Sequence, residues 1–137
     1  MKYLFIFIFI LSVNIHAMDW AIIVHKSNSM NSISQAELKR MLLKQQLFWK
    51  NGTKVVPLIF SNKSVHFEQF TKDILGFTID EYTRYWIEQR YISRQSPPKD
   101  LDFDILPKMG SVFMGLIMVL PSDKFKKNNN LKIIKLK

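Results

Sequence analysis

The sequence predicts a single layered α/β domain in which strands and helices alternate along the chain. Short runs of apolar and β-branched residues, of which Trp20–Val24 is the first, are typical of strands covered on both faces. The segments between them carry apolar residues at helical spacing, and two of these segments begin with a capping signal. Strands that alternate with helices across short loops are the pattern of an α/β layered domain.

The N-terminus has the order of residue types of a signal peptide. Lys2 supplies the positive charge, Tyr3–Val13 is an apolar run interrupted by Ser12, and Ala17 is the small residue that a signal peptidase requires before its cut. We therefore expect residues 1–17 to be a signal peptide and 18–137 to be the working domain. The alternative is an uncleaved membrane anchor, although a span needs about 20 apolar residues. No membrane span is expected after cleavage.

The first strand leads through a Ser- and Asn-rich loop, 26–32, into a helix that begins at Ser34. Ser34 stands three residues before Glu37, which is the spacing of a capping box. Asn51-Gly52 then predicts a tight turn, because both residues tolerate positive φ. The next strand is predicted at 54–60, and Pro57 indicates an edge or irregular position within it.

The second half of the domain follows the same alternation. A helix is predicted after the polar stretch 61–64 and ends at Gly76, and a second capping box, Thr78 and Glu81, opens the next helix. The Pro-rich segment 93–99 must be a loop. The remaining predicted elements are a short helix at 102–106, a buried strand at 112–120, a turn at 128–130 and a last strand at 131–136.

Composition and charge narrow the class of function. The chain has no cysteine, which removes disulfides, thiolate catalysis and thiolate metal sites. Its net charge is +9, of which Lys2 supplies one, so the exported domain carries +8. Such an excess suits anionic partners such as phosphate-like anions, anionic lipid or lipopolysaccharide. Nucleic acid is disfavoured by the predicted export, and a bacterial periplasm is the expected compartment.

No catalytic or cofactor motif is present. There is no nucleophile elbow, no HExxH and no Gly-rich phosphate loop, so we expect no enzyme and no cofactor. His25 and His66 follow two predicted strands and could approach each other as metal or anion ligands. Two histidines without a third ligand are weak evidence, so no metal site is expected.

Several segments resemble, in order and spacing, a known family. They are Ile33–Leu43 followed by Trp49-Lys50-Asn51-Gly52, the strand 55–60, the loop Ser61–Ser64, Leu75-Gly76, Tyr85-Trp86 and Pro97-Pro98. Together they resemble the short, single-domain relatives of the periplasmic substrate-binding protein of phosphate ABC transporters. The resemblance runs from Ile22 to about Gly115. It implies a fold like one lobe of a type II periplasmic binding protein, which is a two-lobed clamp.

Three departures weaken the transfer of phosphate binding from this family. The full-length proteins hold phosphate with an arginine and backbone N–H groups in the loop after the central strand, and Phe60 stands where that arginine would be. Lys44 replaces a family glycine. Gly110 and Gly115 retain only loosely a glycine signature near the end of the family pattern.

Two candidate binding regions follow from the residues. The turn after the strand 54–60 offers hydroxyl groups, a charge and the free N–H groups of a helix start. Its candidate ligand-binding residues are Ser61, Lys63, Ser64, Val65 and His66. The alternative is that Ser64 only caps its helix. A candidate partner surface lies beside an aromatic helix face and consists of Arg84, Arg90 and Arg94. Trp86 on that helix face is predicted to be a core residue.

Three classes of function remain open. The leading one is a non-catalytic periplasmic binding or accessory protein related to phosphate uptake, with weak oxyanion binding because one lobe encloses a ligand poorly. The second is an interaction module that docks on an envelope sensor, transporter or secretion partner. The third, for which residues are lacking, is a hydrolase of phosphate esters.

Overall fold

The computed structural model describes residues 18–137, so the predicted signal peptide lies outside the described residues. The elements are β1 (Trp20–His25), β2 (Ser32–Ile33), α1 (Gln35–Leu42), β3 (Val56–Phe60), α2 (Phe67–Phe70), the π-helix η1 (Thr71–Leu75), α3 (Ile79–Ile92), β4 (Lys99–Leu101), α4 (Leu106–Gly110), β5 (Leu116–Pro121), the 3₁₀-helix η2 (Ser122–Lys124) and β6 (Leu131–Leu136). Among the described residues, none of the helices has the length and apolar character needed to cross a membrane.

All six strands join one mixed sheet in the order β2-β6-β1-β5-β3-β4. β1 is antiparallel to both of its neighbours, and the other pairs are parallel. The carboxyl ends of β3, β4 and β5 therefore meet at one edge of the sheet. The start of β1 lies at the same edge, because Trp20 pairs with Pro121.

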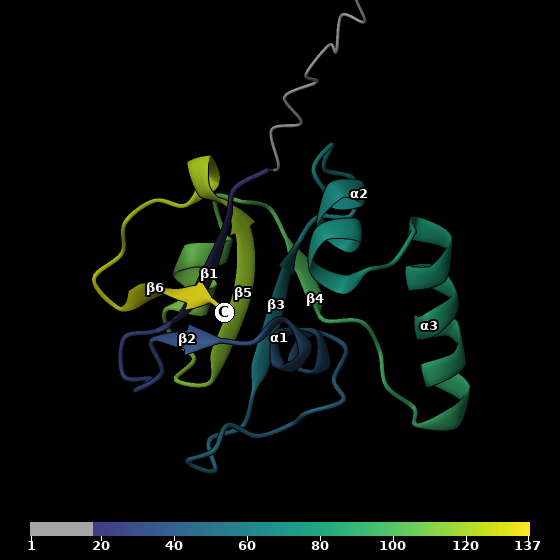
Figure 1. The fold of residues 1–137 in the computed structure, drawn as a ribbon, viewed down its shortest axis with the longest axis horizontal. Coiled ribbons are helices and arrows are strands. Elements are labelled where there is room, and N and C mark those ends of the chain that lie inside the picture. Colours follow the sequence, from purple (N-terminus) through teal and green to yellow (C-terminus); the bar gives the residue numbers. More distant parts are fainter. Residues whose placement is uncertain (1–17) are drawn as a thin grey trace, which may run out of the picture.

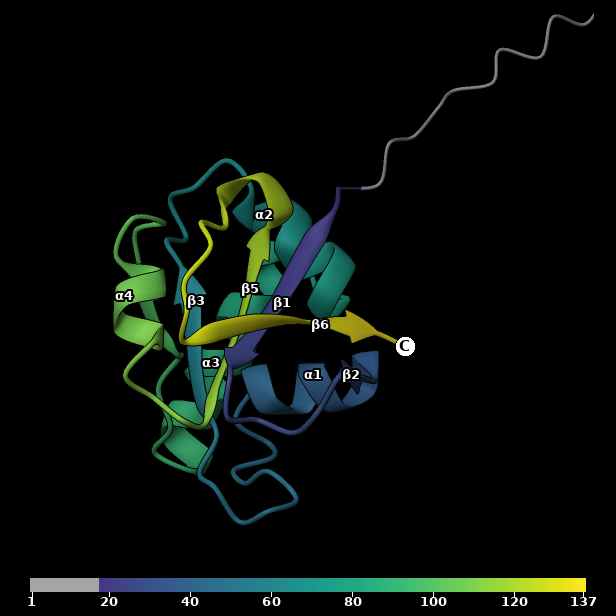
Figure 2. The same cartoon turned by 90° about the vertical axis from the view of Figure 1, so that its left-hand side faces the viewer.

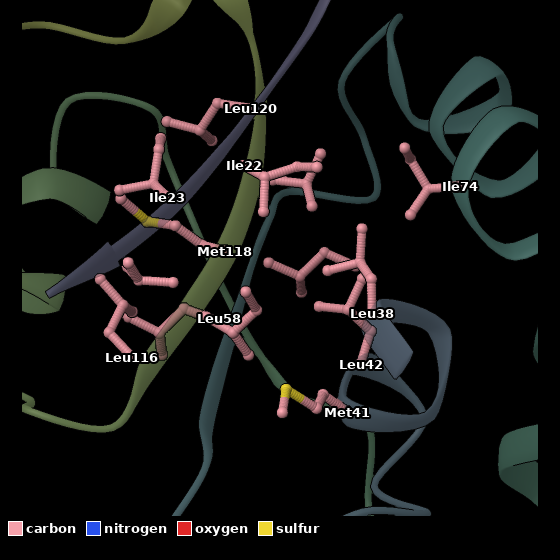
Figure 3. Packing of buried hydrophobic residues seen from close by; sticks show 14 of the residues in the cluster. Ile22, Ile23, Leu38, Met41, Leu42, Leu58, Ile74, Leu116, Met118 and Leu120 are labelled. Carbon is pink, nitrogen blue, oxygen red and sulfur yellow. The ribbon is translucent and has the colours of Figure 1, made fainter. Parts of the chain in front are cut away.

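Helices cover both faces of this sheet, which makes three layers (Figures 1 and 2). In Figure 3, Ile23, Leu116, Met118 and Leu120 lie on the side of α4, and Ile22 and Leu58 lie on the side of α1 and η1. Leu38, Met41 and Leu42 of α1 and Ile74 of η1 complete the second group. β5 is buried at every position, as expected for a central strand covered on both faces.

Local capping signals fix where the helices begin and end. The Ser34 hydroxyl accepts from the Glu37 N–H at 3.1 Å, and the Thr78–Glu81 capping box forms in both directions. The Glu37 carboxylate instead accepts from Gln46, so the first capping box is only half formed. Gly76, at φ 67°, ends η1 in the left-handed conformation that favours glycine.

α3 lies to one side of the layered body (Figure 1). Trp86 is the one buried residue among its fourteen, and it packs edge-on against Tyr82 and Tyr85 of the same helix. The expectation that Trp86 is core is confirmed, since its side chain is 4% exposed. Trp86 also lines a groove beside α3, whose other wall includes Phe67 of α2 and Pro97 of the segment after α3.

A hairpin at 48–54 projects from the body before β3 (Figure 1, lower loop). The predicted Asn51-Gly52 turn forms its tip, with Gly52 at φ 86°. Trp49 anchors it, because its buried indole N–H donates to the Gly115 carbonyl at 2.9 Å. Gly115 also accepts from the Val56 N–H, and a Cβ on Gly115 would overlap the Lys54 carbonyl. Only glycine allows this close approach.

The structure differs from the sequence expectations at the short elements. No strand was predicted at β2 or at β4, and both are strands because they pair with β6 and β3. The predicted strand at 112–120 begins only at Leu116, because 111–115 turns around Gly115. The helix predicted at 102–106 lies instead at Leu106–Gly110, where Pro107 occupies the first turn.

Candidate functional site

A cleft of about 670 Å³ lies where the carboxyl ends of β3, β4 and β5 meet. Three loops leave the sheet here, one after each strand, which is the usual position of a ligand site in an open α/β sheet. Its walls come from the turn after β3 and from the segments after β4 and β5. The lining residues are Ser61, Lys63, Ser64, Asp102, Phe103, Asp104, Asp123, Lys124 and Lys126.

The turn after β3 places three of the five predicted ligand residues in this cleft, namely Ser61, Lys63 and Ser64. The Ser61 hydroxyl accepts from the Lys63 N–H, and the Ser64 hydroxyl accepts from the His66 N–H, both at 3.2 Å. Both hydroxyl hydrogens remain available to donate. The Phe67 N–H is bonded to the Ser64 carbonyl at 3.1 Å. Two N–H groups expected to be free for a ligand are thus used within the turn.

Val65 and His66 do not line the cleft. The Val65 side chain is 91% exposed, and the His66 ring lies edge-on to Phe103 with centroids 6.2 Å apart. α2 begins two residues later than a Ser64 cap requires, with His66 at the N-cap position.

Charges of both signs line the cleft. Three carboxylates, Asp102, Asp104 and Asp123, match the three ammonium groups of Lys63, Lys124 and Lys126, so the formal charges cancel. Lys126 lies 3.9 Å from Asp104 in a fully exposed pair. Six of the nine lining residues were not predicted from the sequence, because β4, which brings Asp102 and Asp104 to this edge, was itself not predicted.

Phe60, the last residue of β3, belongs to the core and not to the cleft. Its side chain is fully buried and stacks on Trp20, with centroids 6.3 Å apart. Phe67, Phe70 and Phe103 surround it at 5.2 to 6.0 Å. The side chain at this position therefore points into the core, and Phe103 separates it from the cleft.

The two histidines do not come together. His66 lies at the carboxyl end of β3, whereas His25 ends the antiparallel strand β1 and so lies at the opposite end of the sheet. His25 Nδ1 is bonded locally to the Ser27 hydroxyl at 2.7 Å. No cluster of three His, Asp or Glu side chains that could hold a metal ion exists within 18–137.

The three predicted partner-surface arginines do not share one surface. Arg90 lines a groove of about 330 Å³ beneath α3, together with Tyr82 and Trp86. Arg94 lines a different cleft, and Arg84 lines neither. The buried Trp86 indole N–H has no hydrogen-bond partner of ordinary geometry among the described residues.

Tyr82 is the most perturbed titratable group in the groove beneath α3. Burial raises the pKa of Tyr82 to about 12, against a smaller lowering by the Trp86 indole and a further rise from Asp100. Tyr82 is therefore a neutral hydroxyl donor throughout the physiological pH range.

Three solved structures share this fold. They are an ABC-type phosphate transport receptor from Vibrio cholerae (13% identity, TM-score 0.64), a putative phosphate ABC transporter substrate-binding protein with bound phosphate from Clostridium perfringens (14%, 0.62) and a possible phosphate binding protein from Planctomyces limnophilus (14%, 0.61). The matches cover 87%, 87% and 88% of this chain but only 46%, 45% and 42% of those chains.

The chain thus spans less than half the length of each of these three structures. No protein-family model and no curated protein matches its sequence. At this identity the likeness establishes the fold alone, and all three structures are described as receptors or binding proteins. The described residues form one α/β domain of the type II periplasmic binding protein fold, as the sequence predicted.

Proposed function

We propose that this chain is a non-catalytic binding or accessory protein of the periplasm, and that it holds a phosphate-like oxyanion weakly in the strand-end cleft. The observation that carries the proposal is the coincidence of this cleft with the turn predicted from the sequence to bind an anion. A structure of the same fold was solved with bound phosphate, which supports the choice of ligand.

The donors of the cleft are suited to a loosely held oxyanion. Ser61 and Ser64 offer hydroxyl donors, and Lys63, Lys124 and Lys126 offer ammonium groups. Each hydrogen bond to a charged group contributes about 1.5–3 kcal/mol. The three aspartates oppose these contacts, and no arginine provides a bidentate contact. We therefore expect a dissociation constant for phosphate weaker than about 1 μM.

Isothermal titration with phosphate and sulfate tests this proposal. We expect weak binding that Lys63→Gln/Lys126→Gln reduces and Asp102→Asn strengthens, because the first change removes attraction and the second removes repulsion. Submicromolar binding, or an affinity that neither change alters, would place the ligand elsewhere. Recovery of the intact chain from the cytoplasm, rather than of a chain beginning at Met18 from the envelope, would refute the periplasmic part.

A second candidate function, docking on a protein of the envelope, is favoured by the outer surface of α3. Tyr91 and Ile92 are 82% and 78% exposed on a helix that contributes one residue to the core. Neighbouring large apolar side chains exposed to this degree are a feature of interaction sites. A photo-activated crosslinker at Tyr91 should give one discrete adduct in intact cells, and the same group at Asp80 should give none. Equal labelling from both positions would argue against docking through α3.

A further inference from the structure

The end of the sheet opposite the strand-end cleft carries a separate cationic surface, which we call the basic end. It consists of the projecting hairpin and a cleft of about 690 Å³ at its base. Its residues are Lys44, Leu47, Phe48, Lys50, Lys54, Arg94 and Lys99. Three segments far apart in the sequence contribute to it: the hairpin region after α1, the loop after α3 and the start of β4.

The cations of the basic end lack compensating charges. Lys44, Lys54, Arg94 and Lys99 line the cleft with no carboxylate among the lining residues. The two salt bridges between described residues involve none of them. Partial burial, with the neighbouring Lys54 charge, lowers the pKa of Lys44 from its usual value. Repulsion within such a cluster favours the binding of an anion from outside the chain.

Backbone conformation points the same way. Lys44 and Arg94 are the two non-glycine residues at positive φ in the described chain, at 57° and 58°. Left-handed backbone costs a residue with a Cβ roughly 1–2 kcal/mol, and glycine would relieve that cost at either position. Both strained positions carry cations and both line the same cleft. Strain of this kind tends to persist at functional sites.

Exposed apolar side chains accompany these cations. Phe48 and Leu47 are 57% and 46% exposed, and Met114, beside Gly115, is 63% exposed. The hairpin is held rigidly, because Trp49 bonds to Gly115 and the Lys54 backbone packs on the same glycine. The hairpin therefore has a defined attachment to the body, and exposed apolar groups lie on the same part of the surface as the cations.

We propose that the basic end docks on the surface of an anionic phospholipid bilayer. Phe48 and Leu47 enter the boundary between headgroups and acyl chains, and the lysines and Arg94 reach the headgroup phosphates. A lipid surface fits better than an acidic protein because the cations come from several segments and offer no bidentate pairing geometry, whereas an array of phosphates requires only proximity. This site is independent of the strand-end cleft, which lies at the other end of the sheet.

Sedimentation with lipid vesicles tests the proposal on the exported protein. The mass of this protein must show that residues 1–17 are absent, because that apolar segment would itself bind lipid. Vesicles of phosphatidylglycerol and phosphatidylcholine should bind the protein, and vesicles of phosphatidylcholine alone should not. Each cation near an anionic surface contributes about fivefold in affinity, so Lys44→Gln/Lys54→Gln should weaken binding by about 25-fold. Phe48→Ser should weaken it by about tenfold.

The matched control, Lys63→Gln/Lys126→Gln, removes the same charge from the strand-end cleft. It should reduce phosphate binding and leave vesicle binding within about twofold to threefold of the parent. Equal loss of vesicle binding in the two double variants would overturn the proposal, as would equal binding to both kinds of vesicle or binding to neither. Competition by millimolar inorganic phosphate would show that free anion, and not a membrane surface, is the ligand of the basic end. Binding of an acidic peptide without vesicle binding would assign the basic end to a protein partner.

Discussion

Gly115→Ala tests whether close approach between the hairpin and the start of β5 determines the stability of this end of the molecule. A Cβ at this position would overlap the Lys54 carbonyl oxygen and lie 2.9 Å from the Lys54 carbonyl carbon. The hairpin would have to move away, which would break the bonds from Trp49 Nε1 and from the Val56 N–H to the Gly115 carbonyl, each 2.9 Å long.

Three effects set the magnitude of this destabilisation. Overpacking against rigid backbone costs about 1–3 kcal/mol, and leaving the buried Trp49 N–H unpaired costs about 1–3 kcal/mol. The Val56 bond contributes about 1 kcal/mol more. We therefore expect Gly115→Ala to lower the free energy of unfolding by roughly 3–7 kcal/mol, measured by urea denaturation of the exported protein.

Gly110→Ala is the matched control. Gly110 is also buried, but a Cβ there would meet only the flexible end of the Leu116 side chain, 2.8 Å away. The better helix propensity of alanine at the end of α4 offsets this contact, so the change in stability should stay within about 1 kcal/mol. A loss below about 1 kcal/mol for Gly115→Ala, or equal losses for the two variants, would refute the reasoning.

Three further predictions concern the aromatic residues. Trp86→Ala should lower stability by about 3–5 kcal/mol and Trp86→Phe by less than about 1 kcal/mol, because the second keeps most of the packing and removes an unpaired N–H; urea denaturation that ranks them equal would contradict this. Because Tyr82 ionises near pH 12 in the folded state and near pH 10 when unfolded, stability below pH 10 is unaffected and should fall by roughly 2–3 kcal/mol between these values. Tyr82→Phe should lack this part of the fall, and identical pH profiles would disprove the assignment. Phe60→Arg should prevent folding without creating a phosphate site, since the guanidinium would be buried among aromatic rings; a folded variant that binds phosphate more tightly would show that position 60 can reach the cleft.

Elements specified by neighbouring residues could be predicted from the sequence, and elements specified by distant partners could not. Thr78 and Glu81 lie three residues apart and define the start of α3 without any tertiary contact. β4 has no apolar alternation in its three residues, and it is a strand because Leu58 and Phe60 pair with Lys99 and Leu101. Without β4, the segment containing Asp102 could not be placed beside Ser61.

The same difference between local and distant interactions explains which parts of the candidate site could be predicted. The polar turn after β3 was predictable, because a buried strand followed by Ser, Asn and Lys must leave the sheet at Phe60. The N–H groups of His66 and Phe67 are bonded within the turn. They are bonded there because α2 begins two residues later than a cap at Ser64 predicts. Boundary shifts of this size are beyond the resolution of a sequence pattern, yet here they decide which donors a ligand meets.

The positive charge of the chain is distributed unevenly between the two ends of its sheet, and this bears on how it acts. The strand-end cleft balances three lysines with three aspartates, so the excess of cations does not serve that cleft. The cleft at the base of the hairpin has four cations and no carboxylate. A domain that used its charge only to capture a small anion would concentrate the excess around the ligand, where focusing raises the local anion concentration. Under the proposed docking, placing the excess at the opposite end separates orientation on an anionic surface from the proposed capture of a ligand. The strand-end cleft then faces away from that surface and stays open while the basic end is engaged. Saturating phosphate should accordingly leave vesicle affinity unchanged, since two sites that share no groups and no moving element have no coupling free energy.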